Sequence, residues 1–308
     1  MNSLRLRILY CLLPSLLYGC AGGNGTLVRS EAQSQATTQL ERGIRAQNKG
    51  ENTQAEKYLS DSLKISSSIE DNPAKVAALI NLARINRLNN KLESALSYID
   101  SALTLTGGIP PQLSAEAAYE KALTEMAQKH FAEALTWADK SLSSDSADLK
   151  GRLLNLLVRI HRSAGKLTEA RAFAVKAREE NRRSGDLAEE SNAVRLLGSL
   201  ERENKKFDEA GKLLLESLDI DKKIGDSQKI AFDLEELAAL FGDKGETDMM
   251  VDYLERAFSV HIGGARLQKG ASIQLKIAEI HRKTGKNELA EKSLQNAEKL
   301  KLKEEDKK

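Results

Sequence analysis

The side chains that usually carry enzyme chemistry are few and scattered along this chain of 308 residues. It contains no H-E-x-x-H zinc motif, no G-x-S-x-G nucleophile elbow and no glycine-rich phosphate loop. Gly263-Gly264 follows a predicted helix and is interpreted as its stop signal. The histidines do not cluster along the sequence: His130, His161, His261 and His281. We therefore predict no catalytic residue, no metal site and no cofactor.

Arginine is the residue type whose spacing does indicate chemistry. Arg152, Arg159 and Arg162 recur at helical spacing, so a helix would place all three on one face. The guanidinium group is a planar fork of N–H donors that fits a carboxylate. The spacing therefore favours a surface suited to acidic groups, provided that the segment is a helix.

A recurring pattern of small residues predicts the helices that would position these arginines. Seven times a small or slim residue is followed twelve positions later by a second, and seven positions after that by a third. A helix of about 3.6 residues per turn places the second and third members on one face, where a neighbouring helix packs closely. The triplets are Gly43, Ala55, Ser62; Ala83, Ala95, Ala102; Ala122, Ala134, Ser141; Val158, Ala170, Ala177; Gly198, Ala210, Ser217; Ala238, Met250, Ala257; and Ala278, Ala290, Ala297.

The intervals between the triplets indicate a repeated unit. The second members, from Ala55 to Ala290, lie 40, 39, 36, 40, 40 and 40 residues apart, and a turn signal precedes each one. Glycine or asparagine in such a turn can end a helix by adopting a left-handed conformation. Each unit is therefore predicted to be a helical hairpin. Val158 and Met250 occupy small-residue positions, which predicts wider helix spacing in units four and six.

Composition favours an all-α protein and argues against one partner class. Aromatic residues make up 4% of the chain and charged residues 30%, with four prolines and no alternating Val/Ile/Thr runs. The formal charge of +2 comes from Arg5 and Arg7, without which 45 basic residues balance 45 acidic ones. A nucleic-acid-binding protein usually carries a strong basic excess. We therefore predict that nucleic acid is not a partner.

Two segments carry a resemblance to a known family. GKLTEA at 165–170 and KFDEA at 206–210 are near the consensus of the tetratricopeptide repeat family, which the chain resembles over residues 34–302. The usual period of that family is 34 residues, whereas the period of about 40 resembles its subclass with longer helices. The resemblance implies an α-solenoid of about seven hairpins, followed by a charged tail over residues 303–308.

The resemblance also implies a concave groove, lined by the first helix of each hairpin, where peptides bind in this family. The groove-facing positions hold Arg84, Arg87, Arg152, Asn155, Arg159, Arg162, Asn192, Arg195, Arg202 and Arg282. Glu203, Glu235 and Glu279 make the charge of this groove patchy. Two interpretations are open. The groove binds an extended peptide through arginine forks and asparagine amides, or it is a solvated face whose local ion pairs contribute about 0–1 kcal/mol each.

The first residues of the chain resemble a bacterial lipoprotein leader. Two arginines precede an apolar run over residues 8–18, which at eleven residues is shorter than the roughly twenty that span a bilayer. The run ends in LYGC, similar to the lipobox in which the cysteine is lipidated and becomes the new N-terminus. This resemblance implies a signal peptide over residues 1–19, lipidation of Cys20 and a flexible tether over residues 20–33. Cleavage after Ala21, giving a soluble periplasmic protein, is the alternative.

Lipidation would fix the protein to a membrane and suggests which one. Several acyl chains hold a protein firmly, because each buried methylene contributes about 0.8 kcal/mol. In the enteric sorting rule an aspartate after the lipidated cysteine retains a lipoprotein in the inner membrane, and Ala21 stands there instead. We therefore expect the periplasmic face of the outer membrane, or the plasma membrane in a host without one. Cys20 would be the one cysteine left after cleavage, which excludes an intramolecular disulfide.

These observations together predict a non-catalytic adaptor that holds other envelope proteins or peptides near the membrane. By resemblance to other tetratricopeptide lipoproteins, the machinery it serves would be a pilus, a secretion channel or an outer-membrane complex, and no residue chooses among them. The rival hypotheses are a soluble periplasmic scaffold, a wall-active enzyme or a regulator of peptidoglycan enzymes. A further rival is self-assembly into a homo-oligomer through the end repeats, which the sequence does not indicate.

Overall fold

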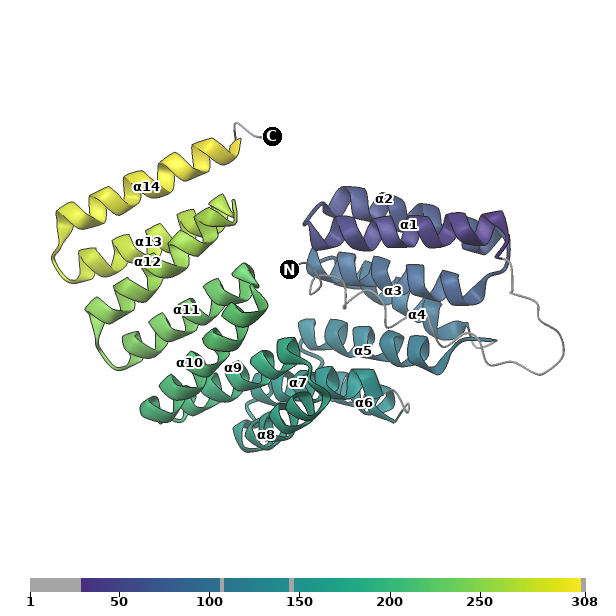
Figure 1. Ribbon diagram of the computed structural model, residues 1–308, viewed down its shortest axis with the longest axis horizontal. Coiled ribbons are helices and arrows are strands. Elements are labelled where there is room, and N and C mark those ends of the chain that lie inside the picture. Colours follow the sequence, from purple (N-terminus) through teal and green to yellow (C-terminus); the bar gives the residue numbers. More distant parts are fainter. Residues whose placement is uncertain (1–28, 106–107, 144–146, 306–308) are drawn as a thin grey trace.

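The computed structural model describes residues 29–105, 108–143 and 147–305. Over these ranges the chain forms fourteen α-helices, which Figure 1 shows stacked in chain order along an arc. The helices are α1 (Glu31–Asn48), α2 (Asn52–Ser68), α3 (Asn72–Leu88), α4 (Leu92–Thr104), α5 (Pro111–Ala127), α6 (Phe131–Leu142), α7 (Ala147–Ser163), α8 (Leu167–Ser184), α9 (Leu187–Glu203), α10 (Phe207–Ile224), α11 (Ser227–Asp243), α12 (Thr247–Gly263), α13 (Leu267–Lys283) and α14 (Asn287–Glu305).

The helices pair into seven hairpins, which confirms the predicted all-α solenoid and the placement of the small residues. Gly43 on α1 shows why they are needed, because a Cβ atom there would lie 2.6 Å from the Cγ atom of Leu59 on α2. Ala55 is fully buried between the same two helices. Met250 is the exception, since it is half-buried and its sulfur would lie 3.0 Å from a Cβ at Gly242. The missing side chain of Gly242 thus makes room for Met250.

Short turns with one left-handed residue join the two helices of each hairpin. The residues with positive φ in these turns are Gly50, Asn90, Lys129, Gly165, Lys205, Gly245 and Gly285. The two lysines differ from the glycine or asparagine expected from the sequence. A Cβ atom makes this conformation cost roughly 1–2 kcal/mol. Packing of the two helices against each other therefore imposes the turn geometry even where the residue type does not favour it.

The helical stack extends three residues beyond the range 34–302 at each end. α1 begins at Glu31 because Ser30 caps it: the Ser30 hydroxyl accepts a hydrogen bond from the Gln33 N–H at 3.2 Å, and the Gln33 side chain accepts one from the Ser30 N–H at 2.9 Å. At the other end, α14 continues to Glu305. The expected signal peptide and Cys20 lie outside the described residues. None of the helices described is long and apolar enough to cross a bilayer.

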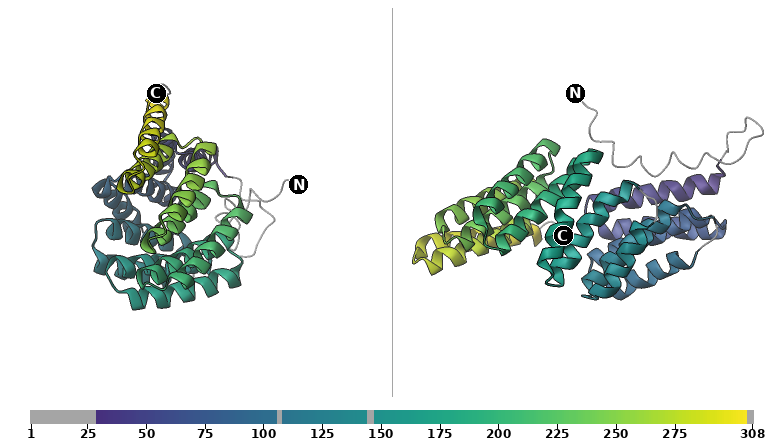
Figure 2. Two further views of the ribbon diagram at one scale, coloured as in Figure 1. Left: turned by 90° about the vertical axis from the view of Figure 1, so that its left-hand side faces the viewer. Right: turned by 90° about the horizontal axis from the view of Figure 1, so that it is seen from below.

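The odd-numbered helices form the inner layer of the stack. The backbones of successive hairpins approach each other at α1 with α3, α3 with α5, α5 with α7, α7 with α9 and α9 with α11, whereas the backbones of even-numbered helices lie farther apart within the described ranges. Long side chains still link α8 with α10, where Arg178 bonds to Glu216 at 2.7 Å. Because the backbones of the odd-numbered helices lie closer together, the stack curves around them. Figure 2 shows the same curved stack from two other sides, and its right-hand view separates the purple helix α1 from the yellow helix α14.

Candidate binding cavity

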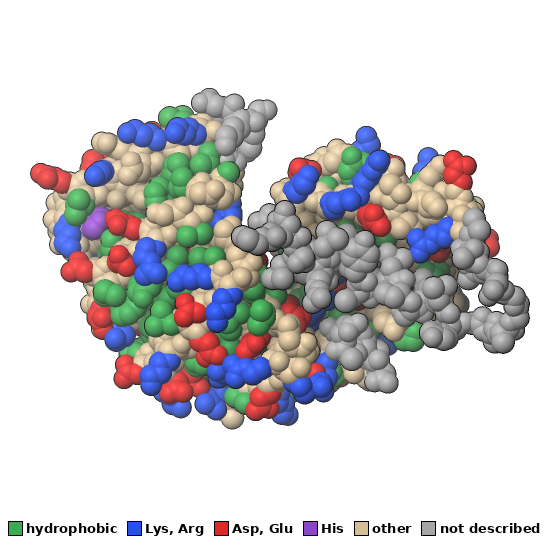
Figure 3. All heavy atoms as spheres, in the orientation of Figure 1, with side chains coloured by type: hydrophobic (Ala, Val, Ile, Leu, Met, Phe, Trp, Pro, Cys, Tyr) green, Lys and Arg blue, Asp and Glu red, His purple; other side chains and the backbone are tan. Residues whose placement is uncertain are grey.

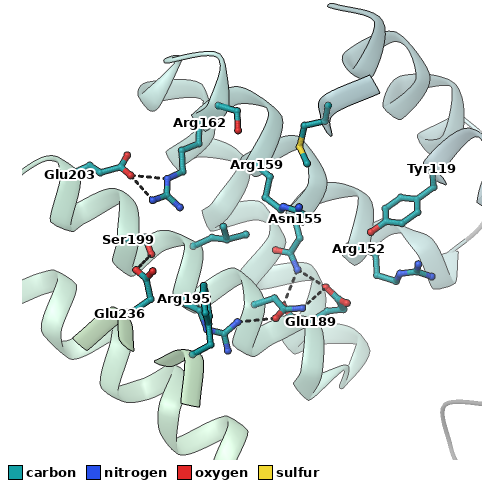
Figure 4. A pocket seen from close by; sticks show the side chains of 15 residues that line it. Tyr119, Arg152, Asn155, Arg159, Arg162, Glu189, Arg195, Ser199, Glu203 and Glu236 are labelled. Carbon is teal, nitrogen blue, oxygen red and sulfur yellow. Dashed lines mark hydrogen bonds and ion pairs between the residues drawn. The ribbon is translucent and has the colours of Figure 1, made fainter. Parts of the chain in front are cut away.

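The middle of the inner surface contains a cavity of about 650 Å³. Figure 4 shows that its walls come from four successive odd-numbered helices, α5, α7, α9 and α11. The side chains that line it belong to Tyr119, Met126, Arg152, Asn155, Arg159, Arg162, Ser163, Glu189, Asn192, Arg195, Leu196, Ser199, Glu203, Phe232 and Glu236. Its volume falls in the range of about 300–1,000 Å³ that is typical of ligand sites.

Helix α7 supplies the largest share of the cavity wall because of its residue spacing. Arg152, Asn155, Arg159 and Arg162 follow one another at intervals of three, four and three, so they form one stripe along the helix. The opposite side of α7 carries Leu153, Leu157 and other buried residues, which hold it against its neighbours. The amphipathic pattern of α7 therefore turns its polar stripe toward the cavity.

The structure brings six of the ten predicted groove residues together in this cavity: Arg152, Asn155, Arg159, Arg162, Asn192 and Arg195. The others, Arg84, Arg87, Arg202 and Arg282, do not line it. Cys20, the predicted lipidation site, lies outside the described residues. The role of these residues in peptide binding stays a prediction.

Most of the groove arginines are tied to a glutamate of the neighbouring hairpin. The Nε atoms of Arg84 and Arg87 lie 3.2 and 2.5 Å from the two carboxylate oxygens of fully buried Glu120. Arg152 donates to Glu116 at 2.8 Å, and Arg162 donates to Glu203 through Nε at 2.8 Å. Arg202 lies 3.8 Å from Glu236 and 3.5 Å from Asp243. These arginines therefore join adjacent hairpins along the inner surface.

Arg195 is the centre of a buried ionic network below the cavity. Its guanidinium Nε donates to the Oδ1 atom of Asp233 at 2.5 Å, and its Nη2 donates to Asp221. Both aspartates are fully buried, and one oxygen of each has no hydrogen-bond partner in the described residues. Ser217 donates to the same Asp233 oxygen at 2.8 Å. Burial raises the pKa of Asp233 to about 6, although Arg195 opposes the shift.

Arg159 is the exception among the arginines that line the cavity. It is exposed to the cavity and has no ion pair or hydrogen bond with any described residue. Figure 4 shows it on the same helix as Asn155 and Arg162. Desolvation by the surrounding walls lowers the pKa of Arg159 and the nearby charge of Arg87 adds to this effect, whereas Tyr119 and the carboxylate of Glu189 oppose it. By contrast, burial acts to lower the pKa of Arg152, but the carboxylate of Glu116 outweighs this effect and the pKa is raised. The cavity therefore contains one positive charge without a counter-charge in contact.

Asn155 leaves a second polar group of the cavity unsatisfied. Its side chain is 5% exposed, and its amide nitrogen donates to the backbone carbonyl of Glu189 at 3.0 Å and to the Glu189 carboxylate at 2.8 Å. Because both of these atoms are acceptors, the nitrogen of the amide must face Glu189 and the oxygen must face away from it. That Oδ1 atom has no partner in the described part of the chain. It is a buried acceptor that lacks a donor.

The wall formed by α9 and α11 adds apolar surface. Phe232 on α11 is 50% exposed, which is unusual for a side chain of its size, and half-buried Leu196 lines the same cavity from α9. The Arg195 guanidinium lies 5.4 Å from the centre of the Phe232 ring. Across the cavity, the Tyr119 ring stacks under Arg152 at 4.6 Å, and burial raises the pKa of the Tyr119 hydroxyl. The cavity thus combines one unpaired cation with two aromatic side chains.

The histidines of the described chain do not form a metal site, and the face drawn in Figure 3 does not carry charge of a single sign. No group of three or more histidine, cysteine, aspartate or glutamate side chains within the described ranges is arranged to hold a metal ion. His161 stacks on Phe173 at 5.1 Å, and His261 bonds to Glu235 at 3.1 Å. On the face in Figure 3, basic and acidic side chains lie interspersed with hydrophobic ones.

Two parts of the chain match known protein families. Residues 34–106 match the family described as tetratricopeptide repeat, and residues 199–308 match the family described as soluble NSF attachment protein, SNAP. Together with the stacked hairpins, these matches decide the type of fold. The chain has a tetratricopeptide-repeat fold. No curated protein sequence matches it significantly.

Solved structures with similar tetratricopeptide-type folds cover most of the chain. Aspartyl phosphate phosphatase F from Bacillus subtilis is 13% identical, with a TM-score of 0.64 over 88% of this chain and 71% of that protein. A Rap protein complexed with competence and sporulation factor is 14% identical, with a TM-score of 0.62 over 89% and 78%. A tetratricopeptide repeat protein from Parabacteroides merdae is 18% identical, with a TM-score of 0.55 over 87% and 93%. At these identities the likeness concerns the fold.

Sequence reasoning missed several residues that shape the site of this tetratricopeptide fold. Tyr119 and Glu189 were not predicted, and neither was Phe232. Two of them stand at repeat positions equivalent to predicted groove residues, since Tyr119 corresponds to Asn155 and Phe232 corresponds to Arg152 in their own hairpins. A search of those positions for every residue type, instead of for arginine and asparagine, would have found both.

Proposed function

We propose that this protein is a non-catalytic adaptor that binds a segment of a partner protein in the cavity between α5 and α11. Tetratricopeptide-type repeat proteins generally mediate protein–protein interaction, which supports this class of function. The observation that carries the proposal is the unpaired guanidinium of Arg159 in a cavity whose other arginines are paired. The Rap protein of similar fold was solved in a complex with competence and sporulation factor, which supports binding by this type of solenoid.

We further propose that the adaptor works in the cell envelope, attached by lipid at Cys20 to the outer membrane. The support is the LYGC lipobox that follows the short apolar run near the N-terminus. Its partners would be envelope proteins, such as components of pilus, secretion or outer-membrane assemblies. A soluble periplasmic scaffold is the alternative, and the mass of the mature N-terminal peptide separates the two. A diacylated or triacylated cysteine supports the anchor, whereas an unmodified N-terminus after Ala21 contradicts it.

A crosslinking pull-down from the native host tests the adaptor function. The variant Arg159→Glu reverses the unpaired charge without breaking an ion pair, and Lys212→Glu makes the same charge change at an exposed site that does not line the cavity. Arg195 is unsuitable for this purpose because its replacement would leave two buried carboxylates without a counter-charge.

We expect at least one protein to be crosslinked to the wild type and to Lys212→Glu but not to Arg159→Glu. Circular dichroism of the purified variants checks that both remain folded. An identical set of crosslinked proteins for all three chains would contradict binding in this cavity. Hydrolysis of peptidoglycan fragments by the purified protein would instead favour the wall-enzyme hypothesis.

A further inference from the structure

The cavity has two features that together describe the chemistry of its ligand. They are the cation of Arg159, which has no ion pair with a described residue, and the exposed ring of Phe232. We propose that the cavity selects a peptide segment that carries an acidic side chain and an apolar one. This inference rests on the proposed function, because it specifies the partner segment that the adaptor would bind.

We assign the binding position of the ligand's acidic side chain to Arg159. Every other predicted groove arginine from Arg84 to Arg202 has a carboxylate within 4 Å, supplied by the chain itself. Arg159 has none among the described residues, although it lies between walls that desolvate it. A ligand carboxylate would supply the missing counter-charge, and the fork of the guanidinium group can hold it through two parallel hydrogen bonds. A basic segment would meet an unpaired cation and be disfavoured.

We assign the binding position of the ligand's apolar side chain to the wall formed by Leu196 and Phe232. Half of the Phe232 surface is exposed to solvent, and its removal from water on binding would contribute favourably. Leu196 extends this apolar surface from the neighbouring helix α9. The acidic and apolar subsites belong to different hairpins, since Arg159 is on α7 and Phe232 is on α11. A ligand that uses both must therefore run across the inner helices.

A display library of random dodecapeptides, selected on the full-length protein, tests this assignment. The selected peptides are synthesised and their affinities are measured by fluorescence anisotropy against the wild type and three variants. Arg159→Gln removes the acidic subsite, Phe232→Ala removes the apolar one, and Lys212→Gln is the charge-matched control. The residues changed are all exposed, so each variant is expected to fold. Each peptide is also made with its acidic side chain as the amide, and separately with an amidated C-terminus.

We expect peptides enriched in one acidic and one apolar residue. Their affinity should fall at least tenfold, equivalent to about 1.4 kcal/mol, with Arg159→Gln or with the side-chain amide. It should fall severalfold with Phe232→Ala and stay unchanged with Lys212→Gln or C-terminal amidation. Loss of binding on C-terminal amidation alone would overturn the assignment to a side chain and point to a terminal carboxylate.

The result also separates failure of this inference from failure of the proposed function. Peptides that bind the cavity but lose no affinity with Arg159→Gln would overturn the acidic subsite and leave the adaptor function standing. Selected peptides that bind all four proteins equally would overturn the inference in full. If the pull-down also gave identical partners for Arg159→Glu and the wild type, the cavity itself would be excluded as the binding surface.

Discussion

Single residues in the inner surface differ in whether their charges serve the fold or remain free for a ligand. Arg195 and Arg159 were both predicted as groove residues, and both line the cavity. Arg195 is held by Asp221 and Asp233, whereas Arg159 has no such partner in the described chain. The same residue type at similar groove positions therefore performs two different tasks.

The buried network around Arg195 makes folding stability depend on pH. Two carboxylates share one guanidinium, and the pKa of Asp233 is raised from 3.8 to about 6 by burial. The folded protein therefore binds this proton more tightly than the unfolded chain does. Protonation stabilises the fold fully below pH 3.8, and this stabilisation is lost as the pH rises through about 6. A pKa difference of this size corresponds to about 3 kcal/mol.

We expect Asp233→Asn to remove this pH dependence. The free energy of unfolding of the wild type, taken relative to that of Asp233→Asn, should increase by about 2 kcal/mol as the pH falls from 7 to 4. Urea unfolding at several pH values measures the difference. Asp219→Asn, at an exposed position on α10, is the control and should show no comparable change between these pH values. Parallel curves for the wild type and Asp233→Asn would contradict the raised pKa.

The sequence could place these side chains but could not distinguish their tasks. Helical spacing and the repeat register put Arg152, Arg159 and Arg195 on the inner surface, as observed. The acidic partner of Arg195 is 38 residues away, and that of Arg152 is 36 residues away. Which acid meets which arginine depends on side-chain reach between adjacent helices, and spacing along one helix does not contain that information.

At the scale of elements, the turns between hairpins keep the same backbone conformation at equivalent repeat positions even where the residue type differs. Gly185 and Gly225 end α8 and α10 in the left-handed conformation, and the aspartate after each one caps the next helix. Forty residues after Gly225 the equivalent position is Ala265, which adopts the same conformation with φ of 56°. Alanine at this φ is strained because its Cβ atom approaches the following carbonyl.

The reciprocal variants Ala265→Gly and Gly225→Ala test this strain. Ala265→Gly should raise the free energy of unfolding by about 0.5–1 kcal/mol, because relief of strain outweighs the greater flexibility of glycine in the unfolded chain. Gly225→Ala should lower it by a similar amount, since φ there is 78°. Urea midpoints of both variants provide the measurement. A change of the same sign in the two would show that contacts of the side chain, and not the backbone conformation, decide the effect.

The elements themselves were largely predictable, and their exceptions have local causes. Triplet spacing predicted seven hairpins because burial between two helices demands small residues at fixed intervals. The expectation of wider spacing at Met250 did not consider Gly242, whose missing side chain accommodates the sulfur. The helix α1 begins three residues before the range 34–302 of the family resemblance, because the capping box of Ser30 and Gln33 lies before the first triplet. A small residue on one helix that makes room for a large residue on its neighbour cannot be recognised from residue spacing along the sequence.

At the scale of the whole molecule, ion pairs on the inner surface stabilise the curvature of the solenoid. Arg84 and Arg87 on α3 both bond to Glu120 on α5, and Glu120 is fully buried. These pairs join odd-numbered helices and draw the inner layer together, and the backbones of even-numbered helices lie farther apart within the described ranges. Ion pairs also occur in the outer layer, where Arg178 and Arg182 on α8 bond to Glu216 on α10. Curvature in turn brings α5, α7, α9 and α11 around one cavity.

Glu120→Gln should therefore open the solenoid as well as destabilise it. The amide keeps the volume of the carboxylate but removes the charge that holds two guanidinium groups, which costs about 1–3 kcal/mol. The radius of gyration measured by small-angle X-ray scattering should increase relative to the wild type. Glu179→Gln, at an exposed site on α8 with no ion pair among the described residues, should change neither quantity. A less stable Glu120→Gln variant with an unchanged radius of gyration would mean that packing between hairpins sets the curvature and that the ion pairs contribute only to stability.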